Sequence, residues 1–231
     1  MKIKLFITAL LLIVSISNAQ KDSVLVCKAS FKNPKYDNAH AGSGFLLKYK
    51  SKTYVITAKH VLFFAKTDSM KTISFGNELK SWTLYSKLNL ENIIVAGQLI
   101  NENTKEDIKM PPKGDWLIFE VKEDIPKNVV VYTLRDEPLR LKENVHFLGY
   151  PYQQEKPISV NGKFIGLTKD GNLRLDVPEG NYNGSSGGPV LDSEGKLVGI
   201  VSMGYFNKVE NKMVFEPASL AYFKTIMNQS K

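Results

Sequence analysis

The chain contains one cysteine, which excludes a protein stabilised by intrachain disulfides and one with a cysteine-rich metal site. Among its 231 residues only Cys27 could form a disulfide, so no intrachain bridge is possible and stability has to come from packing. Cys27 lies in the apolar run SVLVCKASF, where a cysteine is usually a small buried hydrophobe. With one cysteine and three histidines, the chain also lacks the ligand spacing of a metal site.

Arginine is almost as scarce, although the formal net charge is +8. It occurs only at Arg135, Arg140 and Arg174, and the lysines are scattered among acidic residues. The bidentate, stacked contacts typical of nucleic-acid recognition therefore have few candidates. We interpret the charge as that of a solvated surface and expect neither a nucleic-acid partner nor a cofactor.

The N-terminal apolar run is too short to cross a bilayer comfortably. Residues 5–16 form a mostly apolar run of twelve positions, interrupted by Thr8 and Ser15, whereas a transmembrane helix needs about 20. Two lysines precede this run and small residues ending at Ala19 follow it, which is the order of a secretory signal. We expect 1–19 to be a signal peptide, cleaved after Ala19, and the mature protein to be exported without an integral membrane segment. An uncleaved N-terminal anchor is the alternative.

Helical periodicity is confined to the end of the chain, and strand-like segments dominate the rest. Leu220, Phe223 and Ile226 recur at helical spacing within about 217–229. The other segments are rich in β-branched and aromatic residues and are separated by Gly, Asn, Asp, Lys and Pro, which predicts an all-β sandwich or barrel. These segments are SVLVCKASF, GSGFLLKY, KTYVITA, ENIIVAGQLI, DWLIFEV, NVVVYTL, NVHFLGYP, GKFIGLT, NLRLDV, PVLDSEGKLVGIVS and KMVFEP.

A polar stretch with a double proline is the best linker candidate. This stretch, NENTKEDIKMPPKG, runs directly into the apolar segment DWLIFEV, so we expect a long surface loop and not a domain boundary. The later segment VKEDIPKN separates an N-terminal set of strands from a C-terminal set.

His60 lies at the end of an apolar strand, a rigid position that suits a catalytic base. A nucleophilic serine requires a base whose pKa lies near working pH, which favours histidine. His60 ends YVITAKH, where an apolar strand leads into an expected turn of helix, VLFFA. His146 alternates with apolar neighbours, as a strand residue does, and His40 lies in a polar loop. His60 is therefore the candidate base, although a lone histidine in such a position is more often structural.

A carboxylate has to orient such a base and stabilise the imidazolium. Asp115 heads the apolar segment DWLIFEV, so its side chain would be partly buried at the end of a strand, where it has to be hydrogen-bonded. A simple polar residue at a strand start is the alternative. Asp68 and Asp107 are weaker candidates because both lie in polar, loop-like sequence.

The candidate nucleophile lies in a glycine-rich turn, GSSGGP. Gly184, Gly187 and Gly188 allow a backbone that brings two N–H groups to one point beside a serine. Such a nest can hold the oxyanion of a tetrahedral acyl intermediate. Ser186, directly before Gly-Gly-Pro, is the better candidate, and Ser185 is the alternate.

The chain order of these residues excludes one hydrolase fold. GSSGG also fits the Gly-x-Ser-x-Gly turn of α/β-hydrolases, whose histidine follows the serine. No histidine follows residue 146, so the order here is His, Asp, Ser. TAKH, GDWLIFEV and GSSGGP followed by LVGIVSMG resemble the motifs of trypsin-like (chymotrypsin-fold) serine peptidases, in that family's order and rough spacing. GSGFLL and FLGYP resemble bacterial members, including Deg-type proteases, so that the resemblance covers about residues 24–205.

The resemblance implies an all-β fold of two antiparallel six-stranded β-barrels with a short C-terminal α-helix. The barrels would occupy about 22–125 and 126–216, the helix about 217–229, and the site the cleft between the barrels. Only 45 residues follow Ser186, too few for the PDZ domain of Deg-type proteases, so we expect a stand-alone peptidase domain.

The resemblance also assigns roles to site residues. Ser186 would attack the scissile carbonyl, His60 would take and return the proton, and Asp115 would hold His60. Backbone N–H groups of Gly184 and Ser186 would form the oxyanion hole. We expect an exported serine endopeptidase acting on a protein or peptide substrate, and a non-catalytic binding or scaffold protein with the same fold is the alternative.

The substrate pocket is expected to lack charge. Ser202, Met203 and Gly204 resemble the strand that pairs with the substrate backbone and lines the pocket for the residue before the cleaved bond. Members that prefer basic residues carry an acid where this chain has Gly180. Gly180 and Met203 therefore favour apolar or small side chains, and a basic preference, for which the adjacent Glu179 could provide the acid, is the alternative. Lys59 stands where a small residue is usual and is expected to be exposed.

Overall fold

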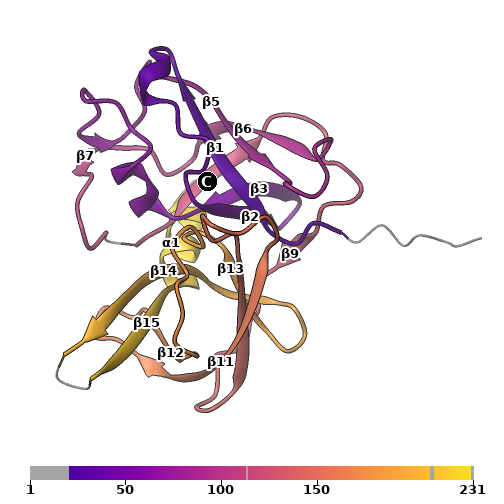
Figure 1. Cartoon of the computed structure of the whole chain (residues 1–231), viewed down its shortest axis with the longest axis vertical. Helices are drawn as coiled ribbons and strands as arrows, with labels where there is room; N and C mark the ends of the chain where they lie inside the picture. Colours follow the sequence, from indigo (N-terminus) through magenta and orange to yellow (C-terminus); the bar gives the residue numbers. More distant parts are fainter. Residues whose placement is uncertain (1–20, 113, 209–210, 230–231) are drawn as a thin grey trace, which may run out of the picture.

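The strands form two barrels, one above the other in Figure 1. The computed structural model describes residues 21–112, 114–208 and 211–229, and the expected signal peptide, 1–19, lies outside them. Within the described residues the chain forms fifteen strands, two 3₁₀ helices and one α-helix. No helix in this part of the chain is long and apolar enough to span a membrane.

The first barrel consists of six antiparallel strands in the order β1-β5-β6-β8-β3-β2, and β2 pairs with β1 to close it. Strand β9 adds to β2 in parallel, and β4 pairs with β7 in a separate ribbon. Their bounds are Leu25–Phe31 (β1), Ser43–Tyr49 (β2), Lys52–Thr57 (β3), Thr72–Ile73 (β4), Leu79–Tyr85 (β5), Ile93–Leu99 (β6), Asn103–Asp107 (β7), Leu117–Val121 (β8) and Val131–Thr133 (β9). The 3₁₀ helices are Pro34–Tyr36 and Lys59–Phe63.

The second barrel closes in the order β10-β11-β12-β15-β14-β13, with all its pairs antiparallel. Its strands are Asn144–Gly149 (β10), Ile158–Leu167 (β11), Leu173–Asp176 (β12), Pro189–Asp192 (β13), Leu197–Asn207 (β14) and Lys212–Ser219 (β15), and helix α1 follows at Leu220–Gln229. The predicted fold of two six-stranded antiparallel barrels and a short C-terminal helix is confirmed.

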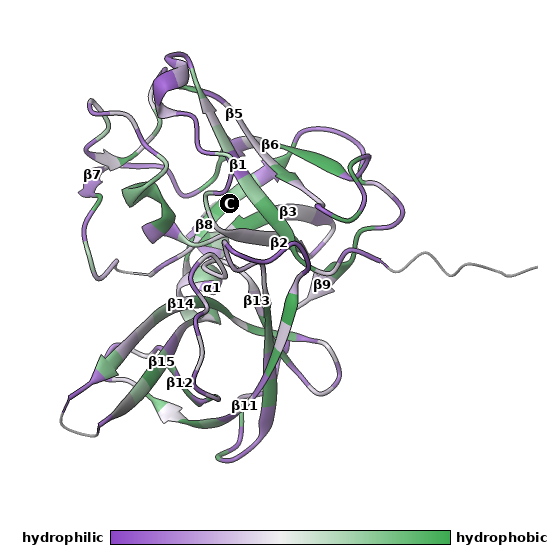
Figure 2. Cartoon of the chain, viewed as in Figure 1, coloured by the Kyte–Doolittle hydropathy of each residue, from purple (hydrophilic) through white to green (hydrophobic). Residues whose placement is uncertain are grey.

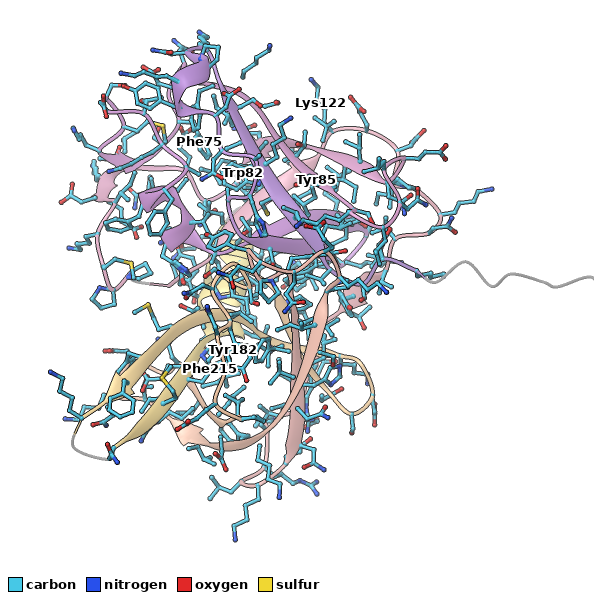
Figure 3. The ribbon with its side chains drawn as sticks, viewed as in Figure 1. Phe75, Trp82, Tyr85, Lys122, Tyr182 and Phe215 are labelled. Carbon is cyan, nitrogen blue, oxygen red and sulfur yellow. The ribbon has the colours of Figure 1, made fainter. Side chains whose placement is uncertain are left out.

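Apolar and polar side chains alternate along the strands, and the apolar ones form the two cores. Figure 2 shows hydrophobic residues gathered on the strands of the first barrel and hydrophilic ones in the loops around it. In that barrel Trp82 of β5 stacks on Phe119 of β8 with ring centroids 5.5 Å apart, and Phe75 contacts both rings. Figure 3 shows Phe75 and Trp82 in the first barrel. In the second barrel Phe147 stacks on Phe215 at 4.8 Å. Rings of this size bury large apolar areas, so each barrel has an interior of its own.

Helix α1 joins the second barrel to the first. Phe223 is fully buried against Trp116 and Tyr49, both at a centroid distance of 5.4 Å, and the indole N–H of Trp116 donates to the carbonyl of Ser219 at 3.0 Å. The helix begins at Leu220, so its predicted start near 217 is three residues early. The reason is that β15 continues to Ser219, where it still pairs with Gly199 of β14.

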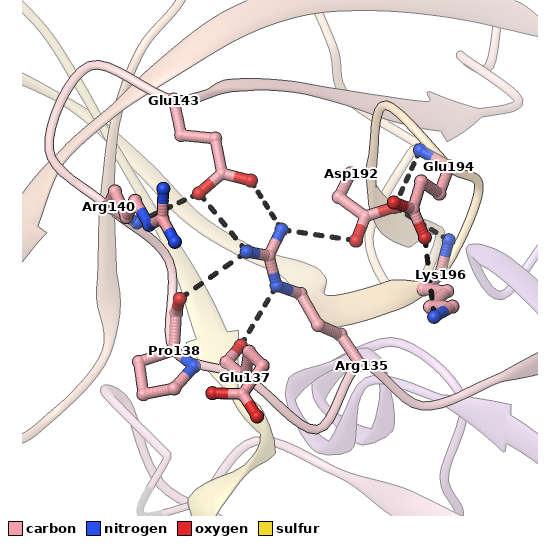
Figure 4. A network of polar contacts seen from close by, with 8 residues as sticks. All are labelled: Arg135, Glu137, Pro138, Arg140, Glu143, Asp192, Glu194 and Lys196. Carbon is pink, nitrogen blue, oxygen red and sulfur yellow. Dashed lines mark hydrogen bonds and ion pairs between the residues drawn. The ribbon is translucent and has the colours of Figure 1, made fainter.

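An arginine network fixes the segment that connects the barrels (Figure 4). Arg135 contacts the carboxylate of Glu143, lies 3.2 Å from Asp192 and donates from Nε to the carbonyl of Glu137 at 2.9 Å. The second oxygen of Asp192 accepts the N–H groups of Glu194 and Lys196, both at 2.9 Å. The connection is thereby held against the β13–β14 turn by charge-assisted hydrogen bonds.

Candidate active site

His60 lies immediately after strand β3 of the first barrel. The apolar residues of β3 run through the core, and the chain leaves the strand at Ala58 to enter the 3₁₀ helix Lys59–Phe63. His60 is 9% exposed, and its backbone N–H donates to Oδ1 of Asp115 at 2.8 Å. Both the main chain and the ring are therefore fixed relative to this carboxylate.

Asp115 accepts three hydrogen bonds although it is only 3% exposed. Its Oδ1 accepts the backbone N–H of His60, and its Oδ2 lies 2.6 Å from Nδ1 of the same residue. The hydroxyl of Ser202 also donates to Oδ2. A buried carboxylate is costly unless it is hydrogen-bonded, and this one has partners from both barrels.

Ser186 lies on the other side of the imidazole. Its Oγ is 2.7 Å from Nε2 of His60, in the turn that precedes β13 of the second barrel. With Nδ1 donating to Asp115, Nε2 is left as the acceptor for the serine hydroxyl, a tautomer assigned from the hydrogen-bond network. The three residues thus form one chain of hydrogen bonds that crosses from barrel to barrel.

Backbone hydrogen bonds hold the turn around Gly184. The carbonyl of Asn183 accepts the N–H of Tyr152 at 2.9 Å, so the trans peptide directs the N–H of Gly184 the opposite way. The N–H of Ser185 donates to the carbonyl of Tyr182 at 2.9 Å. None of the backbone hydrogen bonds of the described turns and loops uses the N–H of Gly184 or of Ser186.

The candidate residues open onto one cleft of about 930 Å³. Its lining includes Gly184 and all the residues predicted to contact substrate. The candidate residues that line the cleft are His60, Gly180, Gly184, Ser186, Ser202, Met203 and Gly204. Asp115 lies behind His60 and does not line the cleft.

The sequence of the chain matches one known family over most of its length. Residues 42–200, more than half of the chain, match the trypsin-like peptidase domain. The chain belongs to the trypsin-like peptidase family. Among solved structures it is similar to the crystal structure of the serine endoprotease from Yersinia pestis, with a TM-score of 0.60 at 16% identity, over 91% of this chain and 63% of that one. The likeness at this identity shows the fold, and no curated protein sequence matches the chain.

The pKa of His60 in this trypsin-like peptidase is raised above its ordinary value of 6.5. Burial of the ring is the largest single effect and lowers the pKa, but the charge of Asp115 and its hydrogen bond together outweigh it. The imidazolium is therefore stabilised where proton transfer from Ser186 would create it.

We expect kcat/KM for peptide hydrolysis to fall as the pH decreases through the raised pKa of His60. The protonated ring cannot take the proton of Ser186, so activity is lost on the acid side with a midpoint above 6.5. A pH profile of kcat/KM measures this, and a midpoint below 6.5 would contradict it. The variant His146→Gln should keep the profile, because His146 lies on β10 and outside the cleft.

Ser43, to which the sequence assigned no role, holds the turn that carries Ser186 against the first barrel. Its backbone N–H donates to the carbonyl of Ser186 at 2.7 Å, and its hydroxyl donates to the carbonyl of Gly184 at 2.9 Å. The same hydroxyl accepts the N–H of Tyr150 at 2.9 Å. Gly187 approaches the backbone of Ser43 closely. It has φ +85°, and a Cβ on it would lie 2.4 Å from the Ser43 carbonyl oxygen. The sequence signal that could have indicated this role is the motif GSGF, which contains Ser43.

Ser43→Ala is expected to destabilise the fold by about 1–3 kcal/mol, because it leaves the buried N–H of Tyr150 and the carbonyl of Gly184 without a partner. Denaturant unfolding measures the change. The matched variant Ser159→Ala, at an exposed position of β11, should stay within about 0.5 kcal/mol of the wild type. Equal stability of the two variants would argue against a role of Ser43 in holding the turn that carries Ser186.

The other candidate residues lie apart from the hydrogen-bonded chain. Ser185 is fully buried, and its Oγ has no hydrogen-bond partner among the described residues. Asp68 is exposed beside Tyr36. His40 lines the cleft and packs edge-on against Tyr152 at 4.7 Å, a position that its polar sequence context did not indicate.

The expectation that Lys59 is exposed is wrong. Its side chain is 2% exposed, its Nζ lies 2.6 Å from Oε1 of Glu106, and it lies over the ring of Tyr222 at 4.7 Å. Glu106 belongs to β7, within the segment predicted as a surface loop, and through Lys59 it contacts the 3₁₀ helix that carries His60. The burial of this lysine is tolerated because its charge is paired.

Proposed function

We propose that the chain is an exported serine endopeptidase that hydrolyses peptide bonds through His60, Asp115 and Ser186. The proposal rests on one observation above all: Ser186 Oγ lies 2.7 Å from Nε2 of His60, while Nδ1 of the same ring lies 2.6 Å from the carboxylate of Asp115. Family membership and the Gly184 turn support it.

The proposed reaction proceeds in two steps. Ser186 Oγ attacks the peptide carbonyl as its proton passes to His60, and the N–H groups of Gly184 and Ser186 bind the oxyanion. The imidazolium, held by Asp115, then donates its proton to the leaving amine as the C–N bond breaks. In the second step His60 takes a proton from water, which attacks the acyl-enzyme. His60 then returns this proton to Ser186 Oγ as the ester C–O bond breaks, which releases the acid and the free serine.

A peptide library tests the function directly. We expect the wild type to cleave a subset of the peptides and Ser186→Ala to leave all of them intact. Ser185→Ala serves as the matched control and should retain cleavage, because Ser185 Oγ makes no contact with His60. Absence of cleavage by the folded wild type would favour the non-catalytic binding protein.

Export is the second part of the proposal. It is supported by the order of basic, apolar and small residues in 1–19. N-terminal sequencing of the protein recovered from its producing cells should begin at Gln20. A chain that begins at Met1 and remains in the cytosol would contradict export without affecting the proposed chemistry.

A further inference from the structure

We propose that Tyr182 and Phe215 form an aromatic floor that restricts the residue before the cleaved bond to a small, uncharged side chain. The inference rests on the proposed function, because the position of Ser186 defines which side chain enters this part of the cleft. It names the substrate class as peptides with Ala, Ser or Val at that residue, called P1 below.

The P1 side chain would enter between two backbone walls. One wall is formed by Gly180 to Gly184, before the nucleophile, and the other by Val201 to Gly204 of β14. Each wall contains a glycine, which in itself would make a wide pocket. The aromatic residues Tyr182 and Phe215 also line the cleft beside these walls.

The rings approach these glycines closely. A Cβ on Gly180 would lie 2.8 Å from the Cζ and the hydroxyl of Tyr182, so the tip of that ring lies directly against the first wall. A Cβ on Gly204 would lie 3.5 Å from Cδ2 of Phe215, so the second ring lies against the opposite wall. The two rings are 6.2 Å apart between centroids and lie in the upper part of the second barrel (Figure 3).

Contacts beneath the floor hold it in place. Phe147 packs edge-on against Tyr182 at 5.1 Å and stacks on Phe215 at 4.8 Å. Phe147 and Phe215 are buried, and the hydroxyl of Tyr182 donates to the carbonyl of Pro178 at 2.6 Å. A deep side chain would have to displace this packed cluster, which close-packed interiors resist.

The cleft also lacks a charge that could pair with P1. Among the described residues that line it, none is Asp, Glu, Lys or Arg. A charged P1 side chain would lose its hydration without gaining a partner. The walls and the floor thus disfavour both charged and large residues.

A matched substrate series tests the proposal. Fluorogenic peptides that differ only at P1 would carry Ala, Val, Phe, Lys or Glu. For the wild type we expect kcat/KM for Ala to exceed that for Phe by at least about 100-fold, since a single methylene is worth about 10–200-fold in a fitted pocket. In Tyr182→Ala this ratio should shrink by at least about 10-fold, because the removed ring leaves room for Phe.

Two further variants make the test decisive. Tyr182→Phe keeps the ring and should keep the wild-type preference. Tyr152→Ala removes another aromatic side chain from the same cleft and should leave the P1 preference unchanged whatever its effect on the overall rate. If Tyr182→Ala fails to fold, the wild-type profile and Tyr182→Phe still decide the question.

The outcomes separate this inference from the proposed function. A wild type that reacts with a fluorophosphonate but prefers Phe, Lys or Glu at P1 would overturn the aromatic floor alone. An unchanged preference in folded Tyr182→Ala would do the same. A wild type that neither reacts with a fluorophosphonate nor cleaves any peptide would overturn the proposed function.

Discussion

Asp115→Asn is expected to lower kcat for peptide hydrolysis by about 10⁴-fold while leaving the fold intact. The carboxylate accepts hydrogen bonds from His60 N–H, from His60 Nδ1 and from Ser202. An amide has a single acceptor oxygen, so its NH₂ group would face Nδ1 and move the imidazole proton to Nε2. That nitrogen could then no longer take the proton of Ser186.

The measurement is kcat for a cleaved peptide, together with the thermal unfolding midpoint. Asp107→Asn is the matched control, because Asp107 is an exposed residue of β7 that pairs with Thr72 and lies outside the cleft. Its kcat should equal that of the wild type. A fall of less than about 10-fold in folded Asp115→Asn would contradict the role given to this carboxylate.

Gly184→Ala is expected to lower kcat/KM by about 10²–10³-fold or more, the effect of losing one oxyanion donor. Gly184 has φ +101°, and a Cβ there would lie 2.7 Å from the carbonyl oxygen of Tyr150 and 2.7 Å from the backbone nitrogen of Tyr152. Backbone atoms cannot move aside as a flexible side chain can. The turn would therefore shift and misplace its N–H.

Gly195→Ala separates backbone strain from the loss of the donor. Gly195 also has positive φ, +75°, but a Cβ there would meet nothing within 4 Å. This variant should lose some stability and retain kcat/KM. Equal activities of the two glycine variants would show that the Gly184 turn makes no special contribution to the rate.

The barrel strands could be predicted because their cores depend on local alternation. Eleven strand-like segments locate the six strands of the second barrel and most of the first. Strand β5 is absent from the predicted set although Trp82 and Leu84 alternate with less buried neighbours, so its omission is an error of pattern assignment. Strand β7 is different: its five residues are polar and partly or fully exposed, so no hydrophobic pattern marks it.

The hydrogen-bonded chain of His60, Asp115 and Ser186 could be located from the order of three short motifs. Their assembly depends on residues that local sequence does not distinguish. Ser43 contacts the turn that carries Ser186 from 141 positions before Gly184. Ser202, predicted as a substrate contact, also donates to Asp115. Such partners are determined by the packing of one barrel on the other and not by any motif of their own.

The burial of Lys59 has the same origin. Its neighbours in sequence are those of an exposed turn, but Glu106 and Tyr222 approach it from 47 and 163 positions away. The boundaries of the two predicted halves and the roles of the site residues stay predictions that the experiments above address.

Mapping of a covalent adduct tests the central claim most directly. The protein would be treated with a fluorophosphonate, digested and analysed by mass spectrometry. We predict one adduct, on Ser186, formed quickly by the wild type and absent from Ser186→Ala. Its rate should fall in Asp115→Asn, because the serine would lose its base. An adduct on another residue, or equal labelling of the wild type and Ser186→Ala, would contradict the assignment of Ser186 as the nucleophile.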